Sequence, residues 1–267
     1  MVYARKEADL RNNTRVLYVE APFDQALAAI DSKDGVIITA KQLADARMQF
    51  DRNHSLSTNG SYIREGNLFV PNSEHRRVLL RNSLIFGNPA EAVKAHRSGN
   101  EYNIPGTVDS VLGKLKEGKD YIFLDKLDAV PTDRFGEDGR MVFLFGKSAQ
   151  DYGLWLNNDG KGVKETGFYN FRNDSHIDKQ SGMFADQLWL HRLDLDSSIS
   201  GNYRYLDYDY TVRGVQSIGE AGAKKKPIVQ TYTPKQMDAY VRKGLHQAGI
   251  SGDLEKRIIT NIANIRK

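Results

Sequence analysis

The 267-residue sequence contains no cysteine. This absence excludes disulfide bonds, thiolate nucleophiles and zinc sites with cysteine ligands. It fits a cytoplasmic protein, and it also fits a virion component or an intracellular protein of a thermophile. We expect a cytoplasmic location.

Long hydrophobic runs are lacking too, since no apolar segment reaches the roughly 18–20 residues that a membrane helix needs. Residues 1–13 have no apolar core, so we expect no signal peptide and no membrane partner. The six histidines are not spaced like zinc ligands, and no glycine-rich phosphate or dinucleotide motif follows a predicted strand. The sequence therefore offers no strong catalytic motif.

Positive charge is concentrated at the C-terminal end. The formal net charge is +4, and residues 214–267 hold ten Lys and Arg against four Asp and Glu. Because Ala221–Pro227 reads as a linker, we expect a main α+β domain over residues 1–220 and a basic helical appendage over residues 227–267. DNA or RNA is the candidate partner of this appendage, and a solvated helical face is the alternative. The candidate contacts are Lys224, Lys225, Lys226, Arg242, Lys243, Lys256 and Arg257.

The N-terminal half alternates predicted strands and helices. Thr39 caps a helix over Ala40–Phe50, and Asn88-Pro89 begins another that ends at Gly99. From Val130 onward the pattern predicts antiparallel strands. They are expected at Arg140–Phe145, Tyr152–Leu156, Gly167–Arg172, Met183–Asp196 and Tyr203–Arg213. The predicted fold is α+β: a mixed α/β segment leads into a curved antiparallel β-meander, and a pair of helices follows at the C-terminus.

The most regular stretch, Met183–Val215, predicts a long β-hairpin. Apolar and polar residues alternate along both arms, and Ser200-Gly201-Asn202 supplies the turn. In the expected register, Leu193 faces Tyr210. The same register sets Asp194 opposite Asp209 and Asp196 opposite Asp207.

Four carboxylates would then share one face of the hairpin. Like charges that lie directly opposite destabilise a β-ladder, so a divalent cation, an Arg or Lys side chain, or water must compensate. Mg²⁺ bound by Asp194, Asp196, Asp207 and Asp209 would activate water and neutralise a phosphate. This face therefore predicts a metal site, with Asp194 and Asp209 as catalytic residues.

His191 is a third candidate catalytic residue. It lies three residues before Asp194, and a histidine beside carboxylates can relay protons near neutral pH. In a regular strand the two side chains point to opposite faces, so they cooperate only across a β-bulge. The alternative is a histidine at the edge of the core.

Aromatic side chains are concentrated in the same predicted strands, among them Trp189, Tyr208 and Tyr210. They could form a stacking platform for bases, and the alternative is that most of them belong to the core. The stretch DGVIITAKQLADAR is similar to the entry of a helix-turn-helix, with an ordinary packing unit of helices and strands as the alternative. Its candidate base contacts are Lys41, Gln42, Arg47 and Gln49.

The combination of a curved antiparallel sheet with Tyr, His and Asp is similar to that of restriction-type enzymes and DNA glycosylases, an analogy at the level of fold. The carboxylate face and the basic segment together favour a nucleic-acid-acting enzyme, a metal-dependent nuclease or restriction-type hydrolase. One alternative is a non-catalytic structural or binding protein such as a phage or virion component. Another is a glycosylase-like enzyme that uses His191 and Asp194. With each of these three functions the chain could form a homodimer.

Overall fold

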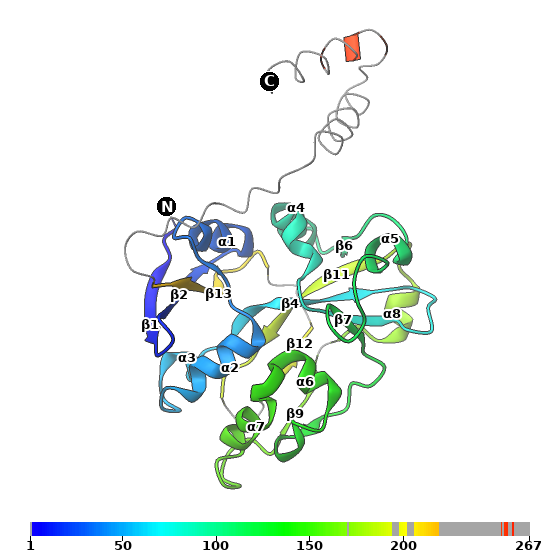
Figure 1. Cartoon of the computed structure of the whole chain (residues 1–267). Helices are drawn as coiled ribbons and strands as arrows, with labels where there is room; N and C mark the ends of the chain where they lie inside the picture. Colours follow the sequence, from blue (N-terminus) through cyan, green and yellow to red (C-terminus); the bar gives the residue numbers. More distant parts are fainter. Residues whose placement is uncertain are drawn as a thin grey trace. The chain divides into compact units, whose positions relative to one another are not determined.

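The computed structural model describes residues 2–169, 171–193, 198–201 and 206–218, together with residues 252, 254, 255 and 258. The chain divides into two compact units, Met1–Ile218 and Gly219–Lys267. All the named helices and strands lie in the first unit (Figure 1). The predicted helical appendage at residues 227–267 falls almost entirely outside the described residues and stays a prediction.

The strands of the first unit form one large sheet and one small ribbon within the described residues. They are β1 (Arg5–Leu10), β2 (Thr14–Ala21), β3 (Val36–Ile37), β4 (Ser61–Phe69), β5 (Arg77–Leu80), β6 (Tyr102–Asn103), β7 (Tyr121–Phe123), β8 (Val130–Pro131), β9 (Glu165–Thr166), β10 (Phe168–Tyr169), β11 (Phe184–Leu190), β12 (Ile199–Ser200) and β13 (Tyr210–Ser217). The large sheet follows the order β1-β2-β13-β4-β11-β12-β10, while β3, β5, β6 and β7 branch from it. Most pairs are antiparallel, and β13–β4 and β10–β12 are parallel.

The helices are short and connect the strands. They are α1 (Phe23–Asp31), α2 (Ala40–Met48), α3 (Ser55–Thr58), α4 (Pro89–Arg97), α5 (Val108–Leu112), α6 (Gly139–Phe145), α7 (Ala149–Asn157) and α8 (Asp174–Asp178), with 3₁₀ turns η1 (Leu84–Gly87), η2 (Thr132–Arg134) and η3 (Gly146–Ser148). The predicted α+β class with a mostly antiparallel sheet is confirmed.

Local start signals placed two helices correctly. The Thr39 hydroxyl accepts a hydrogen bond from the Gln42 backbone N–H at 3.1 Å, and the Gln42 side chain accepts from the Thr39 N–H at 3.0 Å. This capping box satisfies two backbone donors that the first turn leaves open. The Asn88 side chain caps α4 with a single hydrogen bond, accepting from the Glu91 backbone N–H at 3.3 Å, directly before Pro89.

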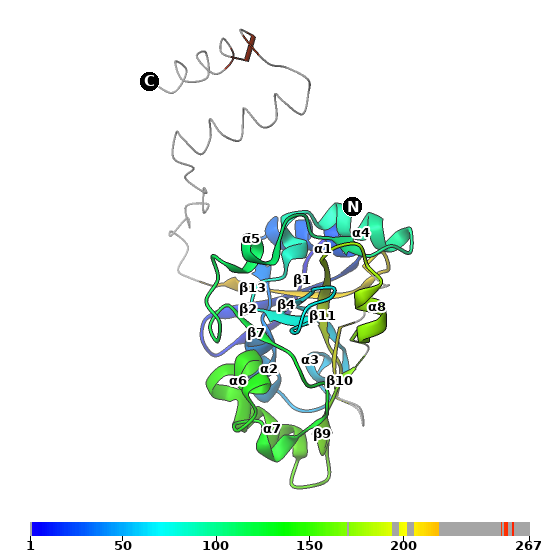
Figure 2. The ribbon, with the colours of Figure 1, turned by 90° about the vertical axis from the view of Figure 1, so that its right-hand side faces the viewer.

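Helices cover both faces of the sheet. Neighbouring residues of a strand point to opposite faces. On β4, Tyr62 packs in the core that includes α1 and α4, whereas Ile63 packs in the core that includes α2, α6 and α7. Figures 1 and 2 show these two groups of helices on opposite sides of the central strands.

Two predicted strands are helices, so the strand predictions at Arg140–Phe145 and Tyr152–Leu156 are wrong. Helix α6 begins after Asp138, whose carboxylate accepts from the backbone N–H groups of Arg140 and Met141. Both stretches are short and apolar, and periodicity cannot separate a buried strand from a buried helix over such lengths.

The predicted hairpin is also wrong. Its two arms, β11 and β13, do not pair with each other, because β4 lies between them. Instead, β12 pairs antiparallel with the end of β11, and the His191 N–H donates to the Ser198 carbonyl. Tyr210 pairs with Ala21 of β2, and the expected register with Leu193 is not formed.

Candidate functional site

The predicted carboxylate face does not exist in the register that defined it. Asp207 and Asp209 precede β13, and Asp209 is exposed to solvent. Asp194 and Asp196 lie outside the described residues. Among the residues that the structure does describe, no group of three or more His, Asp or Glu side chains could hold a metal ion. The side chains of Asp194 and Asp196 are thus not tested, and Mg²⁺ as a cofactor stays a prediction.

His191 lies at the end of β11. Its ring stands edge-on to the Trp189 ring, with 6.3 Å between ring centroids, and its carbonyl accepts from Arg47 at 2.8 Å.

Arg47 itself was a candidate base contact of a recognition helix, and that interpretation is wrong. Its guanidinium is fully buried and also donates to the Tyr152 hydroxyl at 2.8 Å.

The predicted nucleic-acid contacts in the C-terminal segment lie outside the described residues. These are Lys224, Lys225, Lys226, Arg242, Lys243, Lys256 and Arg257. DNA or RNA as their partner stays a prediction.

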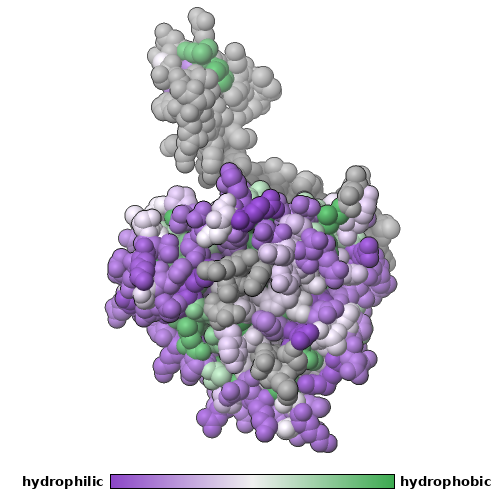
Figure 3. All heavy atoms as spheres, turned by 180° about the vertical axis from the view of Figure 1, so that it is seen from behind, coloured by the Kyte–Doolittle hydropathy of each residue, from purple (hydrophilic) through white to green (hydrophobic). Residues whose placement is uncertain are grey.

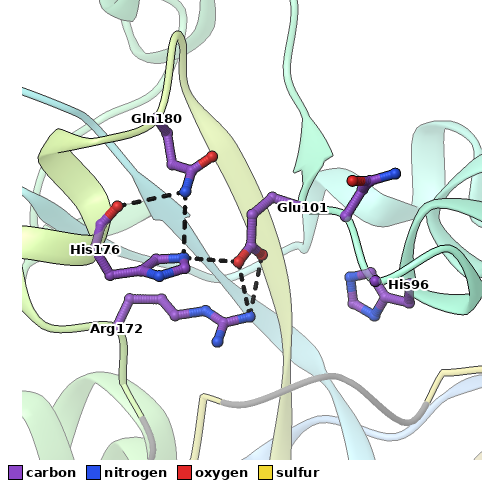
Figure 4. A pocket seen from close by; sticks show the side chains of 7 residues that line it. His96, Glu101, Arg172, His176 and Gln180 are labelled. Atoms are coloured by element: carbon purple, nitrogen blue, oxygen red, sulfur yellow. Dashed lines mark hydrogen bonds and ion pairs between the residues drawn. The ribbon is translucent and has the colours of Figure 1, made fainter.

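A polar pocket on the first unit brings together side chains that the sequence did not single out (Figure 4). His96 comes from the last turn of α4, Glu101 from the loop before β6, and Arg172 from the segment before α8. His176 lies on α8, and Asp186 lies in the middle of β11. We refer to these five residues as the polar pocket cluster.

Glu101 is the centre of this cluster. Its carboxylate accepts from the Arg172 guanidinium, with Nη2 at 3.0 Å from Oε1 and 3.1 Å from Oε2. The His176 Nε2 lies 2.8 Å from the same Oε1, so Glu101 joins an arginine and a histidine from different segments. Figure 4 shows both interactions beside the open cavity.

Asp186 lies behind the lining residues and is fully buried. Its carboxylate is 3.7 Å from Arg172 Nε and 3.9 Å from His96 Nε2, and neither oxygen accepts a hydrogen bond from the described residues. Burial, with a smaller contribution from the Glu101 charge, raises the pKa of Asp186 well above its usual range, while the Arg172 charge acts in the opposite direction.

The sequence carried one signal of this cluster. Asp186 interrupts the apolar stretch FADQLWL of a strand whose residues are otherwise mostly buried. A charged residue in such a position is rarely fully buried without a specific reason. The other four members come from separate loops and short helices, so no local spacing could have identified them.

A second group of side chains lies near the C-terminal end of β11, which contains Trp189. The ring of Trp189 stands edge-on to Tyr62, with centroids 4.9 Å apart, and its centroid lies 5.6 Å from that of Tyr210. Tyr208 lies two residues before Tyr210 in the chain, and their ring centroids are 6.3 Å apart. Tyr208 is 58% exposed and Tyr210 37% exposed. We refer to Trp189, Tyr208 and Tyr210 as the aromatic face.

The described surface also carries other exposed apolar or aromatic side chains, among them Tyr3, Val142 and Leu154. In Figure 3 the described residues on the face seen from behind are mostly hydrophilic, and hydrophobic residues form small separate areas. The indole ring of Trp189 packs directly against the backbone of Gly60. A Cβ atom added at Gly60 would lie 2.5 Å from this ring, so only glycine leaves room for it. Part of the predicted aromatic platform is therefore on the surface, and Tyr62 beneath it belongs to the core.

Comparison with known proteins shows the fold. No family model matches the chain, and no curated protein matches it. A solved structure described as "Accommodation of massive sequence variation in Nanoarchaeota by the C-type lectin fold" is similar, with a TM-score of 0.54 and 16% sequence identity. The match covers 78% of this chain and 99% of that chain.

This similarity overturns the functional prediction. The chain resembles a C-type lectin fold, and its described residues hold no metal-binding group, so the prediction of a metal-dependent nuclease or restriction-type hydrolase is wrong. The glycosylase-like alternative, with His191 and Asp194, has no support in the comparison either. The other alternative, a non-catalytic structural or binding protein, fits better. What the chain shares with the Nanoarchaeota protein is the C-type lectin fold.

Proposed function

We propose that this chain is a non-catalytic binding protein that recognises a protein partner through the aromatic face. The observation that carries the proposal is the placement of Tyr208 and Tyr210, which are 58% and 37% exposed beside Trp189 at the end of the central strands. Tyrosine and tryptophan provide much of the binding energy at protein interfaces.

The sheet holds two of the three members of this face, Trp189 and Tyr210. Trp189 belongs to β11, which pairs with β4 on one side, and its ring is enclosed by Gly60 and Tyr62. Tyr210 begins β13, which pairs with β2 over its whole length. A side chain that is already held in its binding conformation loses little entropy when a partner binds, so this arrangement favours recognition.

The surrounding sequence has the composition of a recognition surface. Residues 196–210, DSSISGNYRYLDYDY, contain three Ser, one Gly, one Asn and four Tyr. Tyrosine also dominates antibody recognition loops, because it gives large contact area at low entropy cost. Ser198, Ser200 and Gly201 are buried, so the tyrosines are the part of this stretch that supports the proposal.

The similar solved structure supports the same interpretation. It is described as a C-type lectin fold that accommodates massive sequence variation. A scaffold that tolerates variation suits a protein in which a stable sheet carries an adaptable binding surface. The fold by itself does not assign a function, so the proposal rests on the aromatic side chains of this chain.

A phage-displayed random peptide library tests the proposal. Peptides enriched on the wild-type protein should bind a Tyr208→Ala/Tyr210→Ala variant at least about tenfold more weakly, because loss of a hot-spot side chain costs 2 kcal/mol or more. Tyr3→Ala removes another tyrosine, 62% exposed on the N-terminal segment, and serves as the matched control. Enriched peptides that bind wild type and double variant equally would overturn the proposal.

A further inference from the structure

We infer that the polar pocket cluster binds a compact organic cation, of which a guanidinium group is the best fit. This site is distinct from the aromatic face and does not depend on the function proposed for it. The cavity is lined by two segments of the chain, residues 96–101 and 172–180, and its volume is about 240 Å³. Drug-sized ligands occupy pockets of roughly 300–1,000 Å³, so this one suits a single side-chain-sized group.

With Asp186 ionised, the charges of the cluster are unbalanced. Two carboxylates, Glu101 and Asp186, share one permanently charged cation, Arg172. The Arg172 Nη2 donates to Glu101, whereas its Nε lies 3.7 Å from Asp186 and makes no hydrogen bond within the described residues. A second positive group in the cavity would balance the second carboxylate.

Asp186 makes this imbalance costly. An ionised carboxylate without hydrogen-bond donors is strongly destabilised in a protein interior, and it binds a proton instead. A cation held beside His96 and Glu101 would lie close to Asp186 in a region of low dielectric constant, where charge interactions are strong. Binding would therefore favour the ionised carboxylate and release a proton.

The neighbouring cavity offers room for the rest of a ligand. It has a volume of about 460 Å³ and shares Asn100, Glu101 and Gln180 with the first. Its own lining includes Glu91, Lys94 and Tyr102, and the Lys94 ammonium lies 3.8 Å from the Glu91 carboxylate. A ligand whose charged group lies in the first cavity could therefore extend into this second one.

Acid should oppose this binding. The titratable and charged groups around the two cavities come from α4, the loop before β6, the segment before α8, α8 and β11. They are Glu91, Lys94, His96, Glu101, Arg172, His176 and Asp186. Burial raises the pKa of Asp186 above its usual range, so this carboxylate takes up a proton on acidification and the proton competes with a cationic ligand.

Isothermal titration calorimetry with arginine compounds tests the inference on the full-length chain. Gly-Arg-Gly and free arginine distinguish a protein side chain from a free metabolite as the source of the guanidinium. Gly-citrulline-Gly is the neutral isostere of the first probe. Binding of either arginine probe, at least about tenfold tighter than citrulline and tighter at about pH 8 than at about pH 5.5, supports the site.

Variants locate the binding in the cavity. Glu101→Gln should weaken binding of the arginine probe at least about tenfold, and Asp186→Asn should remove most of its pH dependence. Glu117→Gln makes the same substitution at an exposed carboxylate elsewhere and should change nothing. Circular dichroism confirms that each variant is folded. No binding of arginine, equal binding of citrulline, full affinity in Glu101→Gln or a preference for inorganic phosphate would overturn the inference.

Discussion

The guanidinium of Arg213 forms a two-point ion pair with the carboxylate of Glu7. Its Nε lies 2.7 Å from Oε2, and its Nη2 lies 2.9 Å from Oε1. Both side chains are buried, and the pair connects β13 to β1, although β2 lies between these strands in the sheet. Glu7 stands at a shift in the register between β1 and β2, between Lys6 and Ala8. Such a bulge changes the direction of a side chain, which here turns Glu7 toward Arg213.

Glu7→Gln should destabilise the protein at neutral pH by about 3 kcal/mol, because it leaves the charge of a fully buried arginine without its partner. Burial acts to raise the pKa of Glu7, but the hydrogen bonds and charge of Arg213 outweigh it, so the pKa lies below its ordinary value of 4.5. The stabilisation is therefore present above about pH 4.5 and is lost as the pH falls through the folded-state pKa.

Urea unfolding of wild type and Glu7→Gln across this pH range measures the effect. The two proteins should differ most near neutral pH and converge in acid. Glu117→Gln, at an exposed carboxylate, is the matched control. An equal difference at acid and neutral pH would show that the ion pair is not its source.

Local signals in the sequence predicted the parts of the fold that depend on neighbouring residues. Thr39 and Asn88 begin helices because their side chains reach backbone N–H groups only three residues away. The α+β class followed from the same kind of pattern. These features need no knowledge of the rest of the chain.

Features that depend on distant partners were not predictable. The hairpin failed because β4, more than a hundred residues earlier, separates its two arms. An alternating strand pattern shows which face is buried, and it does not show which strand lies beside it. The same limit hid the polar pocket cluster, since Glu101 meets His176 across 75 residues of sequence.

Tyr152→Phe should destabilise the protein by about 1–3 kcal/mol, because it removes the acceptor of a buried donor. The Arg47 Nη1 donates to the Tyr152 hydroxyl at 2.8 Å, and both side chains are fully buried. Thermal unfolding measures the loss. Tyr169→Phe removes a hydroxyl from a residue that is 49% exposed and should have little effect. Equal melting temperatures for wild type and Tyr152→Phe would contradict a role for this hydrogen bond.

Glu65 should make the protein less stable as the pH rises. Burial raises its pKa to about 7, although the backbone N–H of Ala40 donates to it at 2.9 Å. Between about pH 4.5 and pH 7 the folded state keeps a proton that the unfolded state has released, so stability falls over this window by up to about 3 kcal/mol. Glu65→Gln should remove this slope in urea unfolding. An unchanged slope in the variant would assign it to another group.

Gly60→Ala should destabilise the protein by about 1–3 kcal/mol, because the added methyl group overpacks the space beneath Trp189. Its Cβ would lie 2.5 Å from three atoms of the indole ring, so that ring must move. Trp189 fluorescence, measured in a Trp155→Phe background, should shift, and peptide binding at the aromatic face should weaken because Tyr210 packs against the displaced ring. Gly87→Ala is the matched control, since nothing lies within 4 Å of its added Cβ. Unchanged fluorescence together with unchanged peptide binding in Gly60→Ala would mean that Gly60 does not hold the aromatic face in place.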